Sequence, residues 1–302
     1  MSDNGSFPAP GSVDIALSMQ AHDRVGLRRT DQAWLDDTWA DPRTRVVLLS
    51  GGRFRLRDDS AEVDWRATAE VPEGQRIFLG MRGDVANFVL LVDEEPAGSS
   101  WTGFRAVGPQ LSAEDAGLLV HALALAEWHA AHRHCPRCGG PLQAAAAGHV
   151  LTCADCGKDQ FPRTDPAVIM LVTEGDRALL GRSPKWPEGR FSTLAGFVEP
   201  GESLERAVVR EVAEEVGVQV TDVTYFGNQP WPFPASLMVG FFAHAVTTEI
   251  HVDGDEICEA RWFTRASMRA EAEAGTLILP GGISISRSLV EAWYGGPLPG
   301  GW

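Results

Sequence analysis

Short apolar runs separated by turn residues recur along most of the chain, and helical spacing is confined to a few places. In the first third, residues 45–49, 75–79 and 86–92 have the β-branched and aromatic content of strands. Further strands are predicted at 167–172, 177–181, 223–227, 237–245 and 260–263, and helices at 112–134, 203–216, 267–273 and 284–293. A strand-rich beginning followed by strands mixed with helices predicts an α/β protein with an α/β sandwich in its C-terminal half.

Charge and hydropathy narrow the class of protein. The chain has 302 residues, with 26 Lys and Arg against 41 Asp and Glu, and its net charge is −15. This excess of acid disfavours a broad nucleic-acid-binding face, which needs a basic field. The sequence has no apolar run of about 18 residues and no basic-then-apolar leader, so we expect a cytoplasmic protein with no membrane partner.

The helix predicted at 203–216 is the most informative one. Ser203 is suited to cap its N-terminus, and Gly217 stands where a helix of this length would end. Steps of four, three and four place one set of residues on a single face: Leu204, Val208, Glu211 and Glu215. The apolar stripe therefore continues as an acidic one, which is not where solvent-exposed glutamates belong on an amphipathic helix.

The acidic half of this stripe predicts a metal site. Glu211 and Glu215 lie one turn apart and repel each other unless a cation lies between them. Carboxylate oxygens are the ligands that Mg²⁺ and Mn²⁺ prefer. A solvated acidic surface is the plainer interpretation of a charge run, but it does not explain acids beside a buried face. We therefore predict a divalent-cation site at the end of this helix, where a cation would also meet a substrate phosphate.

The segment 196–218 resembles the Nudix box. The matching positions are Gly196, Glu202, Arg210, Glu211, Val212, Glu214, Glu215, Gly217 and Val218. In that family the box forms a loop, a helix and a loop that bind divalent metal, and the enzymes hydrolyse a diphosphate linked to another moiety. The resemblance implies that Glu211 and Glu215 are the main metal ligands, that Glu214 assists, and that Arg210 and Glu202 form the pair that orients them.

Two pairs of cysteines form a second candidate metal site. Cys135 with Cys138 and Cys153 with Cys156 each have CxxC spacing, and fourteen residues separate the pairs. This spacing matches a four-cysteine zinc ribbon, in which four thiolates close the coordination shell and the Zn²⁺ is structural. Two disulfides are the alternative, which the absence of an export signal disfavours. The ribbon segment has no basic patch that would favour nucleic-acid binding.

A proline-rich loop follows the box. Between residues 228 and 236, three prolines alternate with Trp231 and Phe233, which stiffens the backbone in extended geometry and projects both rings from it. Such rings stack on flat heterocycles or fill a domain or subunit interface, and spacing alone does not separate these roles.

This loop also carries a narrower resemblance. The run Gln229-Pro230-Trp231-Pro232-Phe233-Pro234-Ala235-Ser236 looks like the signature of the NADH pyrophosphatase family. A zinc ribbon ahead of the Nudix box and a small N-terminal domain fit the same family. The resemblance implies that all eight residues of the signature contribute to a dinucleotide pocket. The family usually has Ser where this chain has Asn228.

The same resemblance implies several further site residues. Phe197 would lie beside the nicotinamide or base, Ala195 would offer a backbone metal ligand, and Glu256 would be a further acidic ligand. Ser286 would contact the substrate through its backbone. Phe161 stands where the family usually has Tyr, and it keeps a face for stacking while losing the hydroxyl.

Arg105 is a separate candidate, from its own position rather than from the resemblance. It follows Trp101-Thr102-Gly103-Phe104 and is a candidate phosphate contact, although a solvated arginine is the commoner case.

These features predict the following organisation: a flexible tail at 1–12, an N-terminal α/β domain at 13–111, a connecting helix at 112–134, a zinc ribbon at 135–160 and a Nudix catalytic domain at 161–302. The resemblance implies a homodimer that hydrolyses NADH or NAD to nicotinamide mononucleotide and AMP with Mg²⁺ or Mn²⁺. The alternatives are removal of NAD caps from RNA 5′ ends, hydrolysis of ADP-ribose-type diphosphates, and a non-catalytic dinucleotide sensor. The complete acidic set disfavours the sensor, because a protein that only binds need not assemble repelling acids.

Overall fold

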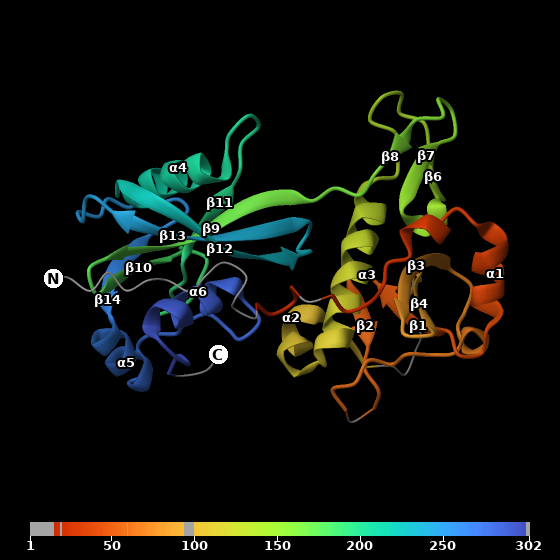
Figure 1. The fold of residues 1–302 in the computed structure, drawn as a ribbon, viewed down its shortest axis with the longest axis horizontal. Coiled ribbons are helices and arrows are strands. Elements are labelled where there is room, and N and C mark those ends of the chain that lie inside the picture. Colours follow the sequence, from red (N-terminus) through yellow and green to blue (C-terminus); the bar gives the residue numbers. More distant parts are fainter. Residues whose placement is uncertain (1–14, 19, 59, 94–99, 300–302) are drawn as a thin grey trace. The chain divides into compact units, whose positions relative to one another are not determined.

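The computed structural model describes residues 15–18, 20–58, 60–93 and 100–299, and the tail predicted at 1–12 lies outside them (Figure 1). The chain divides into two units. Unit 1 is formed by the described residues within 1–18, 165–230 and 236–302, and unit 2 by those within 19–164 and 231–235. No helix in the described part of the chain is long and apolar enough to cross a membrane.

Unit 1 is built on a six-stranded mixed sheet in the order β12–β13–β9–β10–β14, with β11 paired to β9 (Figure 1). The central strand β9 runs parallel to β13 and antiparallel to β10 and β11. The strands are β9 (Asp165–Glu174), β10 (Arg177–Arg182), β11 (Leu194–Phe197), β12 (Val220–Trp231), β13 (Ser236–Ala245) and β14 (Glu259–Thr264).

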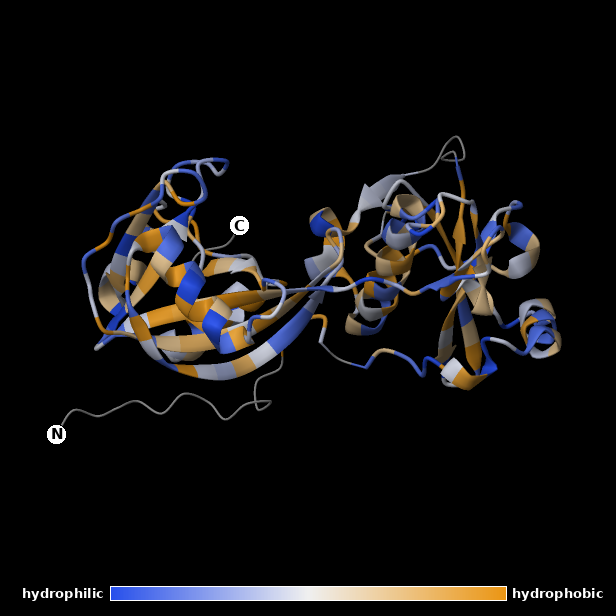
Figure 2. Cartoon of the chain, turned by 90° about the horizontal axis from the view of Figure 1, so that it is seen from above, coloured by the Kyte–Doolittle hydropathy of each residue, from blue (hydrophilic) through white to orange (hydrophobic). Residues whose placement is uncertain are grey.

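Alternation along β9 explains why helices cover both faces of this sheet. Val168 and Met170 pack in one core with Val212 of α4 (Leu204–Val216). Ile169 and Leu171 pack in a second core with residues of α5 (Arg265–Glu273) and α6 (Ile285–Tyr294). Successive strand residues point to opposite faces, so one strand supplies both cores, and Figure 2 shows apolar residues gathered along the strands. The predicted α/β sandwich is confirmed.

Unit 2 contains a five-stranded sheet in the order β3–β4–β1–β2–β5. Its strands are β1 (Arg45–Ser50), β2 (Arg53–Arg55), β3 (Gln75–Arg82), β4 (Val85–Leu91) and β5 (Trp101–Gly103). Its helices are α1 (Gln32–Ala40), α2 (Phe104–Val107) and α3 (Ala113–Ala131), with short 3₁₀ turns at Gly26–Arg28, Thr68–Glu70 and Gly108–Gln110. The sequence pattern did not predict α1, whose only buried residue is Leu35.

Helix α3 begins where the sequence predicts. The Ser112 side chain accepts a hydrogen bond from the Asp115 backbone N–H at 3.1 Å, which is the geometry of an N-cap. The helix belongs to unit 2 and is buried along most of its length, including His121 and His129. His129 Nε2 lies 2.8 Å from the carbonyl oxygen of Gly148, so this histidine links α3 to the turn that contains Gly148.

The segment after α3 forms a small three-stranded sheet in the order β6–β7–β8. Its elements are β6 (Leu142–Ala145), a 3₁₀ turn η4 (Ala146–Gly148), β7 (Val150–Cys153) and β8 (Asp159–Gln160).

Candidate active site

Helix α4 places its glutamates as the sequence predicts. Ser203 caps the helix by accepting a hydrogen bond from the Arg206 N–H at 3.3 Å, and Gly217 ends it with a φ of 71°. Glu211 and Glu215 are buried, with exposed fractions of 7% and 4%. Two carboxylates therefore lie on the buried face of the helix, where each loses hydration and needs a partner.

A glycine on the neighbouring strand accommodates one of these carboxylates. Gly196 lies on β11, and an ideal Cβ built on it would lie 1.9 Å from the Glu211 carboxyl carbon. No side chain fits at this distance, so the Glu211 carboxylate lies directly against the strand backbone. The first glycine of the box is thus required by close approach rather than by backbone conformation.

Arg210 holds the acidic cluster together. Its Nε and Nη2 groups each donate to one oxygen of Glu202 at 2.9 Å. Its Nη1 donates to Glu211 at 2.8 Å and to Glu214 at 2.9 Å, and Nη2 also donates to the Phe197 carbonyl at 2.9 Å. These bonds use all five N–H groups of the guanidinium. Hydrogen bonding to Arg210 lowers the pKa of Glu202, which therefore stays ionised.

The electrostatic balance differs at the other end of the cluster. Burial, followed by the charges of Glu211, Glu256 and Asp253, raises the pKa of Glu215 to about 8. Burial also raises the pKa of Glu211, although Arg210 opposes the shift. The Oε2 atom of Glu215 is buried and has no hydrogen-bond partner among the described residues. A buried acceptor without a partner is rare and calls for an ion or other group that the chain itself does not supply.

The loop after β13 brings two more acids toward α4. The Asp253 N–H donates to the Glu215 carbonyl at 3.2 Å, and the Asp253 side chain accepts from the N–H of Glu256 at 3.2 Å and of Ile257 at 2.9 Å. Glu256 is exposed. The sequence reasoning named Glu256 but missed Asp253, whose signal was the turn-forming run Asp253-Gly254-Asp255.

The donor set at α4 suits a hard divalent cation. It consists of carboxylate oxygens, one of them orphaned, beside a strand backbone, and such oxygens are the ligands of Mg²⁺ and Mn²⁺. The predicted backbone ligand Ala195 is half-buried on β11, next to Gly196. Within the described residues, the acidic oxygens do not converge as closely as the four cysteine sulfurs, and Arg210 donates to three of the glutamates.

The four cysteines form a closed cluster in unit 2. Their sulfur atoms all lie within 4.8 Å of one another, with 3.8 Å between Cys135 and Cys156 and 3.4 Å between Cys138 and Cys153. Thiolates bound to Zn²⁺ at about 2.3 Å in a tetrahedron lie about 3.8 Å apart. The backbone N–H groups of Arg137 and Cys138 lower the pKa of the Cys135 thiol to about 7, which favours the thiolate. The cysteines are unbridged, so the ribbon interpretation holds over the disulfide one.

The two halves of the ribbon share one local geometry. Gly139 donates to the Cys135 carbonyl at 2.9 Å with a φ of 78°, and Gly157 donates to the Cys153 carbonyl at 3.0 Å with a φ of 67°. Each CxxC turn is thus followed by a glycine in the left-handed region, which other residues adopt at a cost.

In the signature loop, the side chain of Gln229 is hydrogen-bonded to backbone atoms. Gln229 is 1% exposed, and its Nε2 donates to the carbonyls of Ala16 at 2.6 Å and Ile283 at 2.7 Å. Its Oε1 accepts from the Ile285 N–H at 3.0 Å. Gln229 therefore ties β12 to the start of α6, a structural role that sequence spacing did not suggest. Substrate contact by this residue stays a prediction.

The aromatic residues of the loop belong to unit 2 with Arg105. The Arg105 guanidinium lies 4.9 Å from the ring centroid of Phe233 and 5.8 Å from that of Trp231. The two rings pack edge to face at 5.2 Å, and Phe104 lies 5.9 Å from Phe233. Arg105 is thus exposed to solvent with its guanidinium over an aromatic surface, and phosphate contact by this residue stays a prediction. The remaining loop residues predicted to bind substrate are Pro230, Pro232, Pro234, Ala235 and Ser236, of which Pro232 is buried.

Three further residues that were predicted to contact the substrate differ in their exposure to solvent. Ser286 is 1% exposed, and its Oγ lies 2.8 Å from the hydroxyls of both Ser192 and Thr193, just ahead of β11. Phe197 and Phe161 are 58% and 67% exposed, which is unusual for rings of this size and leaves their faces available for stacking.

Comparisons with known proteins agree with this arrangement. Three family profiles match the chain: the NUDIX domain at 163–278, the NADH pyrophosphatase zinc ribbon domain at 130–161 and the NADH pyrophosphatase-like rudimentary NUDIX domain at 43–128. A protein from Mycobacterium bovis named NAD-capped RNA hydrolase NudC is 39% identical over 300 residues, which cover 92% of this chain and 94% of that protein. The chain belongs to the NADH pyrophosphatase family of Nudix hydrolases.

A second curated protein and a solved structure are also similar to this chain. A protein of the same name from Stutzerimonas stutzeri is 39% identical over 251 residues, covering 79% of this chain and 85% of its own length. A solved NUDIX hydrolase from Nitrosomonas europaea has a TM-score of 0.44 at 20% identity, over 55% of this Nudix hydrolase and 95% of that chain.

Proposed function

We propose that this Nudix hydrolase uses Mg²⁺ or Mn²⁺ to hydrolyse the diphosphate of NADH or NAD, giving nicotinamide mononucleotide and AMP. The observation that carries the proposal is the orphaned oxygen of Glu215, buried among carboxylates of like charge at the end of α4. A dication would compensate this charge and bridge it to a diphosphate. The signature loop and the family membership support a dinucleotide as the substrate.

The reaction adds water across the phosphoric anhydride. The water oxygen forms a bond to one phosphorus, the bond from that phosphorus to the bridging oxygen breaks, and the bridging oxygen leaves with the other phosphate. Proton transfer from the water balances the two monoester products. A bound dication would neutralise the diphosphate and lower the pKa of a coordinated water.

The chain's own residues divide this work. Four glutamates would hold the cations: Glu211, Glu214, Glu215 and Glu256. Gly196 leaves room for the carboxylate of Glu211. Arg210 has no N–H left for a phosphate because its donors hold the acids and the β11 carbonyl. It is therefore a positioning residue that orients carboxylates.

Product analysis tests the proposal. NADH, NAD and ADP-ribose are each incubated with the enzyme, with and without Mg²⁺ or Mn²⁺, and the products are separated by chromatography. We expect metal-dependent release of AMP together with the nicotinamide mononucleotide from NADH or NAD, and slower turnover of ADP-ribose. Metal-independent turnover, or cleavage that leaves the diphosphate intact, would contradict the proposal.

Removal of NAD caps from RNA is a second candidate function. The relatives that are 39% identical over most of their length carry the name NAD-capped RNA hydrolase. The same anhydride bond would be cleaved, and the net charge of −15 argues that the RNA body adds little affinity. Comparing kcat/KM for NADH and for NAD-capped RNA at two salt concentrations distinguishes the substrates, because a bound RNA body makes KM salt-dependent.

The proposal also covers the oligomeric state of the protein and its location in the cell. We propose a homodimer that acts in the cytoplasm, supported by the family resemblance. Light scattering during size-exclusion chromatography measures the mass, and a monomer mass near 32.6 kDa would contradict the dimer.

A further inference from the structure

Three hydroxyl groups meet in unit 1, where the chain enters β11. Ser286, the second residue of α6, is 1% exposed, and Thr193 is 6% exposed. Ser192 is half-buried, and its backbone pairs with Gly181 of β10, so this segment is held in the sheet. Buried polar groups are almost always satisfied, so each proton in such a cluster has a definite acceptor.

The hydrogen bonds of Ser286 fix the direction of the cluster. The Thr193 N–H donates to Ser286 Oγ at 3.2 Å, and the Thr193 hydroxyl donates to the same atom at 2.8 Å. A hydroxyl oxygen has two lone pairs and one proton, so these two donors use both acceptor positions of Ser286. In the contact of 2.8 Å between Ser286 Oγ and Ser192 Oγ, Ser286 is therefore the donor.

Ser192 stands at the end of this series of hydroxyls. Because its oxygen accepts the proton of Ser286, its own O–H needs a different acceptor. Among the residues that the structure describes, the Ser192 hydroxyl has no other hydrogen-bond partner. A half-buried donor whose direction is set by two buried neighbours is suited to meet an acceptor atom of a ligand.

The start of α6 holds the cluster in place. The Ser286 N–H donates to Ser284 Oγ at 3.2 Å, and the Ile285 N–H donates to Gln229 Oε1 at 3.0 Å. Ile285 also belongs to the core against which Ala195 of β11 packs. The hydroxyl of Ser286 is thus joined to the glutamine of the signature loop and to the strand that carries the predicted backbone metal ligand.

The position of Ser192 in the chain points to a nucleoside rather than to the reacting phosphates. Ser192 precedes Ala195 by three residues, which is about 10 Å of extended backbone. A cation bound near Ala195 would hold the diphosphate, so an acceptor beside Ser192 belongs to a part of the substrate beyond the diphosphate. In a dinucleotide that part is a ribose or a base, and both carry acceptor atoms.

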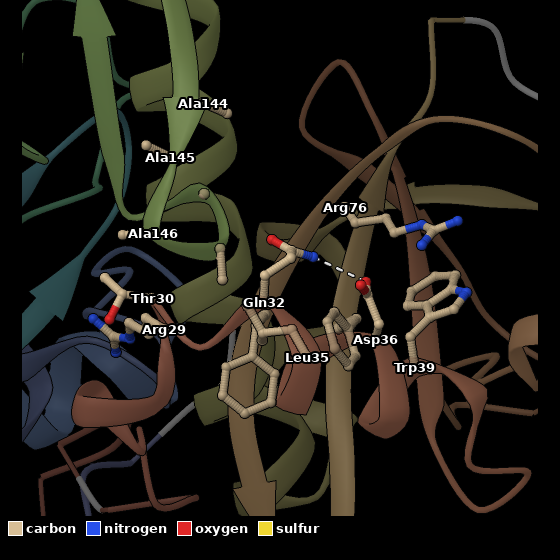
Figure 3. Close-up of a pocket in the computed structure, with 14 residues that line it drawn as sticks. Arg29, Thr30, Gln32, Leu35, Asp36, Trp39, Arg76, Ala144, Ala145 and Ala146 are labelled. Atoms are coloured by element: carbon tan, nitrogen blue, oxygen red, sulfur yellow. Dashed lines mark hydrogen bonds between the residues drawn. The ribbon is translucent and has the colours of Figure 1, made fainter.

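The cavity of about 420 Å³ in unit 2 lacks such convergence (Figure 3). Gln32 in its wall donates to Asp36 at 2.9 Å, and the Arg76 guanidinium lies 4.1 Å from the Trp39 ring centroid. Figure 3 shows Arg29 and Arg76 pointing away from each other on opposite sides of this wall. Most of the polar side chains there pair with their own neighbours, so we assign no ligand to that cavity.

We infer that the Ser192 hydroxyl donates a hydrogen bond to an acceptor atom on one nucleoside of the bound dinucleotide, and that Thr193 and Ser286 are positioning residues that direct it. The inference rests on the substrate proposed above for unit 1. It adds a binding residue that lies in neither the Nudix box nor the signature loop.

Steady-state kinetics with NADH tests the donor. Ser192→Ala should raise KM about fivefold, the effect of one neutral hydrogen bond, and change kcat by less than about twofold. Ser192→Thr keeps the hydroxyl and should hold KM within about twofold of the unmodified enzyme. Ser288→Ala is the matched control, because Ser288 is half-buried on α6 outside the cluster. Its KM should equal that of the unmodified enzyme.

Two failures are distinguishable in this experiment. An unchanged KM in Ser192→Ala, with NADH turned over by the unmodified enzyme, would overturn the inference alone. Absence of metal-dependent NADH cleavage by the unmodified enzyme would refute the proposed function instead.

Thr193→Val tests the direction of the hydrogen bonds. Valine has nearly the shape of threonine without the hydroxyl, so Ser286 regains an acceptor position and Ser192 can donate to it instead. KM should rise about threefold although Thr193 does not touch the substrate, and kcat should stay within about twofold. Urea unfolding measures the stability of each variant. A loss of stability in Thr193→Val with an unchanged KM would show that the cluster is only structural and overturn the inference.

Competitive inhibitors locate the acceptor atom. AMP, nicotinamide mononucleotide and methylenediphosphonate are each measured against the unmodified enzyme and Ser192→Ala. We expect about fivefold weaker inhibition by the one nucleotide whose nucleoside meets Ser192, and unchanged inhibition by methylenediphosphonate, which has no nucleoside. Unchanged inhibition by both nucleotides, or weaker inhibition by methylenediphosphonate, would overturn the nucleoside assignment. If Ser192→Ala fails to fold, Thr193→Val provides the same measurements.

Discussion

The zinc ribbon and the end of helix α4 are both clusters of metal-ligating side chains, but they are built in opposite ways. In the ribbon, the four cysteine sulfur atoms all lie within 4.8 Å of one another. At α4, Arg210 donates hydrogen bonds to three carboxylates, and the fourth, Glu215, is left with a buried oxygen that has no partner among the described residues. The four thiolates are fully coordinated by one ion. The glutamates at α4 still have a carboxylate oxygen free to bind a cation that arrives with the substrate.

This difference indicates how structure and catalysis divide between the two clusters. A closed thiolate shell leaves no position for water or phosphate, so its ion serves the fold. At α4, the charges of neighbouring carboxylates add to burial in raising the pKa of Glu215 to about 8, which a bound cation would reverse. The following predictions test the contrast, beginning with the largest expected effect.

Cys153→Ser should remove the ribbon's ion and destabilise unit 2 by about 4 kcal/mol or more, as loss of a structural metal does. Zinc content by atomic emission and denaturant unfolding measure the two effects. Cys258→Ser is the control, because the Cys258 sulfur lies outside the cluster, 3.3 Å from the Arg182 carbonyl. Full zinc occupancy in Cys153→Ser would refute the four-thiolate site.

Glu215→Gln should lower kcat by roughly 10²–10³-fold, the range for losing one preorganised charge at a reacting centre. The fold should be retained, because the amide is the same size and burial already favours a neutral group there. Glu205→Gln, on the exposed first turn of the same helix, is the matched control and should keep normal turnover. Near-normal turnover of Glu215→Gln would exclude that residue from the site.

Unit 1 without divalent metal should lose stability as the pH rises. The folded pKa of Glu215 is about 8 against an ordinary value of 4.5, so between these values the folded state keeps a proton that the unfolded state releases. The free energy of unfolding should therefore fall by up to about 1.4 kcal/mol per pH unit in this window. Added Mg²⁺ binds the ionised form and should reduce the loss.

Urea unfolding at several pH values, compared between the unmodified protein and Glu215→Gln, isolates this effect. The comparison is needed because burial lowers the pKa of His22 and of His149 in unit 2 to about 4. These histidines give the opposite slope, with stability lost as the pH falls from about 6.5 toward 4. Equal slopes in the two proteins would show that Glu215 is ionised when metal-free.

Phe161→Tyr should have the smallest effect, at most about fivefold in KM. Phe161 is 67% exposed, so an added hydroxyl meets solvent and changes no packing. The ring face that would stack on a base is retained, and any gain comes from one hydrogen bond. Steady-state kinetics with NADH measures the change, and a large change in kcat would show that the ring does more than stack.

Local spacing explains which parts of this architecture the sequence could predict. CxxC pairs, a Ser203 cap and carboxylates at helical spacing encode their geometry within a few residues, and the structure contains all of them. Gln229 and Asp253 could not be placed in this way. Their partners lie on segments distant in sequence or are backbone atoms that no side-chain pattern reports.

Two helices show the same limit of what can be predicted from local sequence. The sequence predicted the start of α3 at Ser112 but not that the helix is buried along most of its length within unit 2. Helix α1 was missed because its apolar periodicity is weak and a single residue, Leu35, is buried. Burial depends on what the rest of the chain places against an element, and that information is not local.

The contact between Gly196 and Glu211 has a consequence for how such a protein could diverge. One methyl group on that strand would push the carboxylate out of its place, since an added Cβ would lie 1.9 Å from the carboxyl carbon. The surrounding sheet would keep its strand pairing, because strands accept alanine. A lineage could thus change from a hydrolase into an inert dinucleotide-binding protein through a single-codon change, with no trace in its overall architecture.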